Sequence, residues 1–256
     1  MSALLKLNHP VQGIAMNAQQ ALAPTGKLRA GMNIGNTLFT RQNEAGELFG
    51  VSVDLMQELA KSLDVPLELL VYQQPGQVAD DALNDKWDVA ILAIEKTRAK
   101  TIIFSPGMTE IEAGYVVQQN SSFELADQVD SIGIKIAAPE KAGYERYLMT
   151  TLKNASIVHT QNFAGSLELF NQNQVDAVAG LKPNLIESMH LLPTGKLLQG
   201  NFMTVNHGFS VPLGRVEAAA YLEKFVKQLI EKSFVDSSIK KHQIIGLTAI
   251  KPLHNP

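Results

Sequence analysis

The feature that most constrains the fold is an order of strands and helices that occurs twice along the 256 residues. Apolar runs typical of strands alternate with patterns typical of amphipathic helices, first over 28–94 and again over 132–180. The predicted strands are 28–34, 67–72, 87–94, 132–138, 156–160 and 175–180, and the predicted helices are 51–63, 77–84, 143–152 and 166–172. This order indicates a parallel sheet covered by helices in each half.

Two stretches support an internal repetition. NDKWDVAILA (84–93) and NQNQVDAVAG (171–180) each place a polar helix end before an Asp and a small apolar strand. We interpret the two acids, Asp88 and Asp176, as structural residues at strand entrances. In open α/β sheets of this kind, ligands bind at the carboxyl ends of the strands.

The end of the chain indicates how the halves are connected. A strand-like run at 207–214 is followed by helical patterns at 215–232 and 234–242, and no third set of strands follows. We therefore expect the chain to return to the first half. The expected organisation is a first lobe of 27–114 plus 209–256, a second lobe of 119–203 and an N-terminal helical extension of 1–26. Crossings near 114–119 and 203–208 would form a two-strand hinge.

Charge and composition exclude several classes of function. A net charge of -3 without a basic run excludes a nucleic-acid partner. The chain has no Cys, and its 6 His residues lack the spacing of a helical metal motif, so neither a metal site nor a cofactor is expected. No apolar stretch approaches the roughly 18 residues that span a bilayer. The first residues lack the apolar core of a signal peptide, so the protein is either cytoplasmic or exported by a leader absent from this sequence.

Over most of its length, from Lys27 to Gly246, the chain resembles family 3 of the bacterial extracellular solute-binding proteins. Segments matching in order and spacing carry the resemblance: KLRAGMNIG (27–35), GELFGVSVDLMQELAKSLDVPLELL (46–70), KWDVAILAIEKTRAKTIIFSPG (86–107) and VDAVAG (175–180).

The resemblance implies a two-lobed α/β fold of the type II periplasmic-binding-protein kind. Each lobe would be an open, mostly parallel sheet with helices on both faces, and the lobes would be joined by a two-strand hinge. The implied protein is a periplasmic monomer that closes around a small carboxylate-bearing ligand, an amino acid or an organic acid. It would deliver this ligand to the membrane permease of an ABC transporter.

In the first lobe, the resemblance assigns Arg98 to the ligand carboxylate, because the family places an Arg seven residues before the Ser of a Phe-Ser-Pro segment, here Ser105. A guanidinium donates two parallel hydrogen bonds to a carboxylate and keeps its charge. The alternative is an ordinary surface arginine. Phe39 corresponds to an aromatic ligand wall or is simply core, and Asn33 is a polar ligand contact or a turn cap.

The second lobe departs from the family pattern. Where the family commonly has a Gly followed by Thr or Ser that binds carboxylate at a helix start, this chain has Glu140, Lys141 and Ala142, so the hydroxyl is missing. Lys141 either supplies charge or is solvated. Leu181 stands where amino-acid binders carry an Asp for the ligand ammonium. An unpaired ammonium is costly to bury, so this site should prefer a carboxylate with an apolar body over a zwitterion.

Three acids near Arg98 along the chain are the alternative partners for a ligand ammonium: Glu95, Glu110 and Glu112. The alternative interpretation of each acid is an ordinary surface charge with no role in binding. The same three acids and Glu140 are the candidates for a general acid if the chain were a cyclohexadienyl-dehydratase-like enzyme on this scaffold. No acid–base pair, nucleophile elbow or phosphate loop is recognisable, so we expect a binding protein and not an enzyme. A ligand-sensing domain is the third possibility.

Overall fold

A computed structural model describes residues 18–140 and 142–252 and divides them into two compact units. The first unit contains the described residues up to Thr109, Asn206–Ile244 and those from Thr248 onward, and the second contains Glu110–Val205 and Ile245–Leu247. Of the expected N-terminal helical extension 1–26, residues 18–22 are helical and residues 1–17 lie outside the described part.

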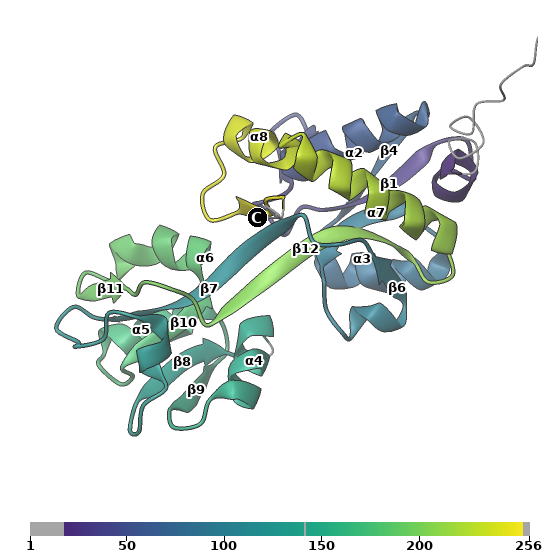
Figure 1. Ribbon diagram of the computed structural model, residues 1–256. Helices are drawn as coiled ribbons and strands as arrows, with labels where there is room; N and C mark the ends of the chain where they lie inside the picture. The colour runs from purple at the N-terminus through teal and green to yellow at the C-terminus, as the bar shows by residue number, and fades with distance from the viewer. Residues whose placement is uncertain (1–17, 141, 253–256) are drawn as a thin grey trace, which may run out of the picture. The chain divides into compact units, whose positions relative to one another are not determined.

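The first unit is built on a sheet with the strand order β4-β1-β5-β12 (Figure 1). Strands β1, β4 and β5 are parallel, with Leu28 opposite Leu67 and Ala30 opposite Val89, and β12 is antiparallel to β5. Its elements are β1 (Leu28–Asn33), β2 (Arg41–Gln42), β3 (Leu48–Phe49), α2 (Val51–Leu63), β4 (Leu67–Tyr72), α3 (Pro75–Asp81), η1 (Ala82–Asn84), β5 (Val89–Ala93), η2 (Arg98–Lys100), β6 (Ile102–Phe104), α7 (Val216–Glu231), α8 (Phe234–Lys241) and β13 (Thr248–Ala249). The strands β7 (Thr109–Gln118) and β12 (Met203–Pro212) continue from one unit into the other.

Helices cover both faces of the first-unit sheet because its central strands are buried on both sides. On one face, Gly31 of β1 lies against Val78 of α3 and against Trp87, so close that a Cβ on Gly31 would be 3.2 Å from the Val78 side chain. On the other face lie α2, α7 and α8 (Figure 1). Trp87 is fully buried, and its indole N–H donates to the Val78 carbonyl at 2.8 Å.

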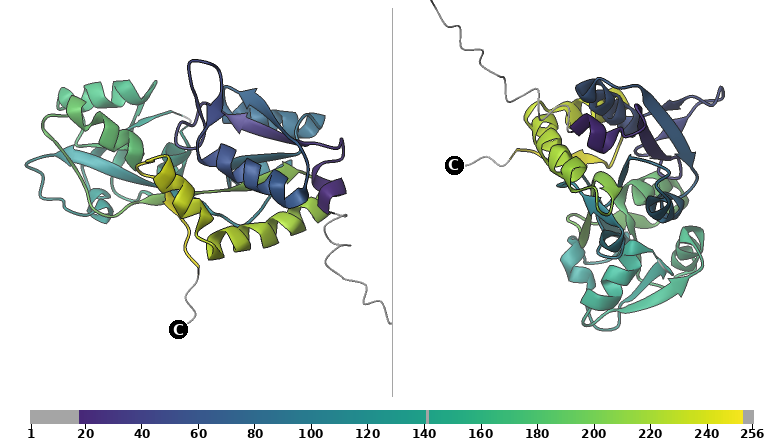
Figure 2. Two further views of the ribbon diagram at one scale, coloured as in Figure 1. Left: turned by 90° about the horizontal axis from the view of Figure 1, so that it is seen from above. Right: turned by 90° about the vertical axis from the view of Figure 1, so that its right-hand side faces the viewer.

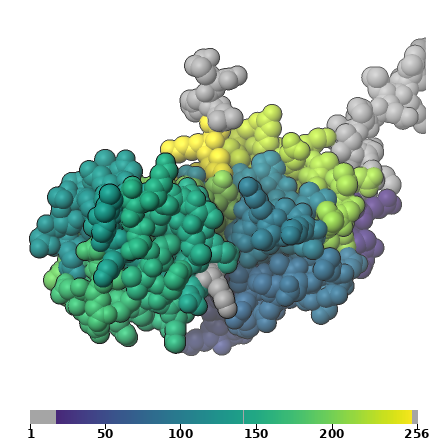
Figure 3. Space-filling view, turned by 90° about the horizontal axis from the view of Figure 1, so that it is seen from below, coloured from purple at the N-terminus to yellow at the C-terminus, as the bar shows by residue number. Residues whose placement is uncertain are grey.

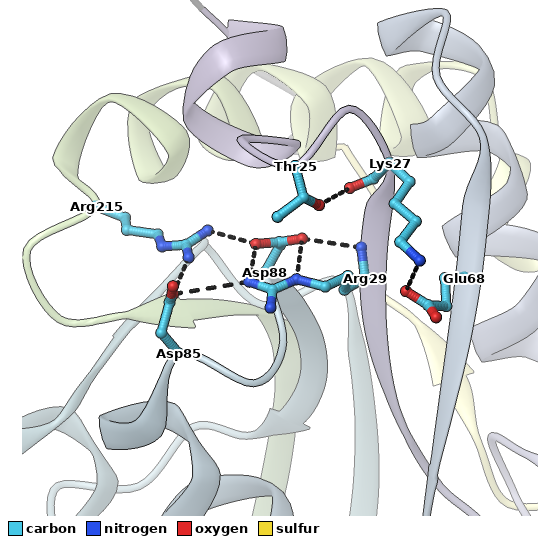
Figure 4. A network of polar contacts seen from close by, with 7 residues as sticks. All are labelled: Thr25, Lys27, Arg29, Glu68, Asp85, Asp88 and Arg215. Carbon is cyan, nitrogen blue, oxygen red and sulfur yellow. Dashed lines mark hydrogen bonds and ion pairs between the residues drawn. The ribbon is translucent and has the colours of Figure 1, made fainter.

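The first unit is tied together by a charged network at the amino ends of β1 and β5 (Figure 4). The fully buried Asp88 carboxylate accepts hydrogen bonds from the Arg29 backbone N–H at 2.9 Å, from the Arg29 guanidinium at 2.9 and 3.0 Å, and from Arg215 at 2.8 Å. Arg215 also pairs with the exposed Asp85. Because Arg215 immediately precedes α7, the network fastens the returning chain to the strands formed near its start.

The second unit repeats this plan with the strand order β7-β10-β8-β9 (Figures 1 and 2). Strands β8, β9 and β10 are parallel, and β7 is antiparallel to β10. Its further elements are η3 (Ala126–Val129), β8 (Lys135–Pro139), α4 (Gly143–Thr151), β9 (Ser156–Thr160), α5 (Phe163–Asn171), β10 (Ala177–Leu181), α6 (Lys182–Glu187), η4 (Ser188–Leu191) and β11 (Gly195–Leu197). One core packs Leu148 of α4 onto the sheet, and another packs Phe170 of α5 and Leu185 of α6 onto the opposite face.

The internal repetition is visible in the hydrogen bonds of the two matching acids. The Asp88 N–H donates to the Arg29 carbonyl at 2.8 Å, and the Asp176 N–H donates to the Lys135 carbonyl at 2.9 Å. Each carboxylate in turn accepts the backbone N–H of that same residue, Asp176 at 2.8 Å from Lys135. Each acid therefore fastens the entrance of its own strand to the strand beside it.

The structure adds elements to the expected order and shifts some boundaries. Between the predicted strand 175–180 and the strand-like run 207–214, the structure has α6 directly after β10, followed by β11 and the beginning of β12. The strand expected at 132–138 begins only at Lys135, because Ile132 and Gly133 lie in a turn and Ile132 is almost fully exposed. Residues Asn206–Ile244 belong to the first unit, and in Figure 3 the yellow-green segments lie beside the blue ones.

Candidate functional site

We define the first-unit edge as the carboxyl ends of β1 and β5, at Asn33 and Ala93, where open α/β sheets bind ligands. At Asn33, the side-chain oxygen accepts the N–H of Gly35 at 3.1 Å. Asn33 therefore caps the turn after β1. Gly35 is needed there, because a Cβ on this residue would lie 2.3 Å from the Gln73 carbonyl oxygen.

The structure brings Arg98 and Glu95 together at this edge. Arg98 lies in η2 and donates from Nη1 to the carbonyl oxygen of Ala93, the last residue of β5, at 3.3 Å. The same Nη1 lies 3.5 Å from Glu95 Oε1, and the Arg98 side chain is 16% exposed. The guanidinium is thus held at the end of β5 with an acidic partner from its own unit.

Phe39 is buried and packs against a residue that sequence reasoning missed, His207. Their ring centroids are 4.6 Å apart, and His207 lies opposite Ala93 in the pairing of β12 with β5. His207 is itself buried. The sequence feature that could have identified His207 is its place as a histidine at the start of the apolar run 207–214. Phe39 is therefore part of a buried aromatic pair at the first-unit edge.

We define the second-unit edge as the carboxyl ends of β8, β9 and β10, at Pro139, Thr160 and Leu181. Glu140 is exposed, and its N–H donates to the Thr160 carbonyl at 2.9 Å. Ala142 precedes α4 and donates its N–H to the Pro139 carbonyl at 3.3 Å. Lys141 lies outside the described residues. The backbone N–H of Glu140 is thus bonded to the neighbouring strand β9, and that of Ala142 is bonded within the turn.

A buried acid on this edge, Glu145, also escaped the sequence analysis. It lies in the first turn of α4, is 3% exposed, and its Oε1 is 3.2 Å from Nδ1 of His159 in β9. An acid in the first turn of a helix is favoured by the helix dipole, so its sequence position gave no sign of a special environment.

Leu181 ends β10 half-buried, and the next residue, Lys182, forms an ion pair with Glu112 of β7. Glu112 Oε1 also accepts from Asn201 Nδ2 at 3.0 Å. The hydrogen bond from Lys182 holds the pKa of the Glu112 carboxyl below its ordinary value, against the opposing effect of partial burial. Glu112 is therefore an ionised carboxylate with its own cation.

The three acids considered as partners for a ligand amine are thus separated by the structure. Glu95 pairs with Arg98 in the first unit, and Glu112 pairs with Lys182 in the second. Glu110 forms no ion pair with another of the described residues.

Over residues 18–140 and 142–252, no group of three or more His, Asp or Glu side chains is arranged to hold a metal ion. None of the helices in that part of the chain has the length and apolar character needed to cross a bilayer.

Similar folds are found among solved structures. A binding component of an ABC transporter from Wolinella succinogenes, complexed with lysine, matches 86% of this chain and 96% of its own at 17% identity and a TM-score of 0.67. The periplasmic VFT2 domain of BvgS from Bordetella pertussis matches 88% and 97% at 16% identity and a TM-score of 0.68. The ancestral amino acid-binding protein AncCDT-1, a precursor of cyclohexadienyl dehydratase, matches 87% and 98% at 20% identity and a TM-score of 0.63. These likenesses confirm the type II periplasmic-binding-protein fold expected from the sequence.

No curated protein sequence matches the chain. The model of one protein family, however, matches residues 28–243, which include both units and both edges. The chain belongs to family 3 of the bacterial extracellular solute-binding proteins.

Proposed function

We propose that this protein is the binding component of an ABC-type uptake system and that its ligand is a small molecule bearing a carboxylate, an amino acid or an organic acid. Arg98 is the observation that carries the proposal. Its guanidinium is mostly buried and is fixed at the carboxyl end of β5, the position where an open α/β sheet binds ligands. A planar guanidinium at such a position suits bidentate binding of a carboxylate.

We assign supporting roles to residues of both edges. On the first-unit edge, the Phe39–His207 pair supplies an apolar wall, and Asn33 shapes the turn beside it. On the second-unit edge, Glu140, Ala142 and Leu181 line the ends of β8 and β10. Lys141 is assigned only by its place in the sequence.

Ligand capture by hinge closure is part of the proposal. The chain passes between the units within β7, at Thr109 and Glu110, and within β12, at Val205 and Asn206. In hinge closure, a few residues in such connecting segments absorb the change in backbone angles. We further propose that the protein is a periplasmic monomer that delivers its ligand to a membrane permease; the description of the family as extracellular solute-binding proteins supports a place outside the cytoplasm.

We infer that the protein binds its ligand without converting it. A general acid requires a raised carboxyl pKa, whereas the pKa of Glu112 is lowered by its bond to Lys182. Glu95 is paired with Arg98, and Glu140 is exposed. Glu95, Glu112 and Glu140, three of the four candidate acids named from the sequence, are therefore poorly suited to the chemistry of a dehydratase.

The test is a thermal-shift screen of the purified protein against amino acids, aliphatic acids and aromatic acids, followed by calorimetry on any compound that binds. For a carboxylate ligand, Arg98→Ala should weaken binding by about 2–4 kcal/mol, because a charged hydrogen-bonding partner is lost. Lys100→Ala is the matched control: it removes a positive charge from the same short helix, but the side chain is exposed. Equal effects of the two substitutions, or a library in which no acid binds, would refute the proposal.

A further inference from the structure

The side chain of Lys182 is fixed along its length on the second-unit edge. Its aliphatic stem lies across Gly114 of β7, where an added Cβ would be 3.3 Å from Lys182 Cε and 3.4 Å from Cγ. The side chain is only 19% exposed. Because Gly114 has no side chain, the stem can pack on the strand and hold the ammonium group in one place.

That place is the carboxylate of Glu112. In the pairing of β7 with β10, Ala113 lies opposite Leu181, so Glu112 stands level with Lys182 at the carboxyl end of β10. Lys182 Nζ engages Oε2, and Asn201 engages Oε1 at 3.0 Å. The Glu112 side chain is still 40% exposed, so it lies within reach of a bound molecule.

We propose that Lys182 determines ligand specificity: its ammonium occupies the place on Glu112 that a ligand ammonium would need, so the second unit selects carboxylates that carry no amine. This inference rests on the proposed function, since it specifies the ligand class of that same site. The observations from which it is argued all lie in the second unit.

The physical reason is that a ligand amine must compete with the Lys182 ammonium for the Glu112 carboxylate, and the ligand amine is at a disadvantage. A group tethered to the same chain acts at an effective concentration in the millimolar range or above. A ligand amine must displace it and leave the partly buried Lys182 ammonium without its acidic partner, which is costly. Removing the Lys182 charge frees Glu112, and the site then gains a place for an ammonium.

The experiment compares wild type with Lys182→Met, which keeps the stem and removes the charge. The probes are 3-phenylpropionate, L-phenylalanine and 2-phenylethylamine, which share a phenyl ring and differ in their charged groups. Calorimetry measures the two acids, and NMR of the Glu112 carboxyl carbon measures the response to the amine. We expect Lys182→Met to lower the midpoint of the Glu112 response to 2-phenylethylamine at least tenfold. We also expect it to shift the affinity ratio of L-phenylalanine to 3-phenylpropionate tenfold toward the amino acid.

Two further variants serve as controls. Lys196→Met breaks the ion pair of Lys196 with Glu124 in the same unit. Lys196 lies opposite Val117, level with the beginning of β10 and thus at the other end of that strand. It should leave the Glu112 response as in wild type. The double variant Lys182→Met, Glu112→Gln should lose the gain, and Lys182→Gln replaces Lys182→Met if the latter does not fold.

The inference is overturned if the Glu112 midpoint is the same in wild type and Lys182→Met, or if wild type itself binds L-phenylalanine tenfold more tightly than 3-phenylpropionate. Failure of the proposed function looks different, because then no acid binds wild type in the library screen. The Glu112 response to 2-phenylethylamine still decides the role of Lys182 in that case, since it needs no carboxylate binding.

Discussion

Among single residues, Asp88 of the first unit accepts hydrogen bonds from two arginine side chains. Two guanidinium groups, each on a side chain that is 17% exposed, donate to a carboxylate that is fully buried (Figure 4). The matching acid of the second unit, Asp176, is exposed and accepts the Lys135 backbone N–H. The same local hydrogen-bond pattern is therefore set in two very different electrostatic environments.

We expect Asp88→Asn to lower the free energy of unfolding by about 3 kcal/mol, because it leaves two mostly buried cations short of negative charge. Asp176→Asn keeps an oxygen acceptor and breaks no ion pair within 18–140 and 142–252, so it should cost about 1 kcal/mol or less. Urea unfolding of the two variants measures the difference. Equal losses would show that the charge of Asp88 adds nothing to the shared backbone pattern.

The two acids also show how far single residues can be interpreted from sequence. Their structural role at strand entrances was evident from the repeated Asp before an apolar strand. The contacts of Glu112 were not, because both Lys182 and Asn201 are distant from Glu112 along the chain. Long-range side-chain pairing depends on strand register, which periodicity does not determine.

At the scale of elements, the helices α2 and α8 are joined by one carboxylate. Asp54 of α2 accepts hydrogen bonds from Ser238 at 2.8 Å, from Lys241 at 2.8 Å and from His242 at 3.0 Å. Burial raises the pKa of the Asp54 carboxyl, but the hydrogen bonds from these three residues outweigh it and leave the pKa below its ordinary value.

A lowered pKa in the folded state means that Asp54 stabilises the fold above the unfolded-state pKa of about 3.9, and that this contribution is lost as the pH falls through the folded-state value. We expect Asp54→Asn to cost about 1.5–3 kcal/mol at pH 7. The difference from wild type should shrink when urea unfolding is repeated near pH 3. Asp236→Asn, which breaks only the exposed pair with Lys240 on α8, should cost about 0.5 kcal/mol or less. A loss for Asp54→Asn that is the same at both pH values would contradict this account.

Most elements of both units were predictable from the sequence because the apolar periodicity of each segment ends where a turn signal such as Gly or Pro begins. The helix 51–63 and the strands 67–72 and 156–160 coincide with α2, β4 and β9. The short elements β11 and α6 were not predicted, since three- and six-residue segments carry little periodicity. The start of α2 requires a glycine for a reason that the sequence alone does not reveal. Gly50 has φ 121°, and a Cβ there would lie 2.5 Å from the Phe39 carbonyl oxygen.

At the scale of the whole molecule, the chain has two units with separate cores and a single tryptophan, Trp87, buried in the first. Tryptophan fluorescence should therefore report the unfolding of the first unit only, whereas far-UV circular dichroism reports both. In Asp88→Asn, we expect the fluorescence transition to move to lower urea than the transition followed by circular dichroism. Coincident transitions by both probes in this variant would show that the two units unfold as one cooperative body.

The chain passes between the units twice, and this also determines the order in which the two units are completed during synthesis on the ribosome. Almost all of the second unit, from Glu110 to Val205, is continuous, whereas the first unit needs both the segment ending at Thr109 and the helices after Asn206. The nascent second unit can thus acquire its native contacts while the first is still incomplete. Until Arg215 emerges, Asp88 has only Arg29 as a cationic partner among the described residues of the nascent chain, and α2 lacks α8. The part of the protein made first is accordingly the part completed last.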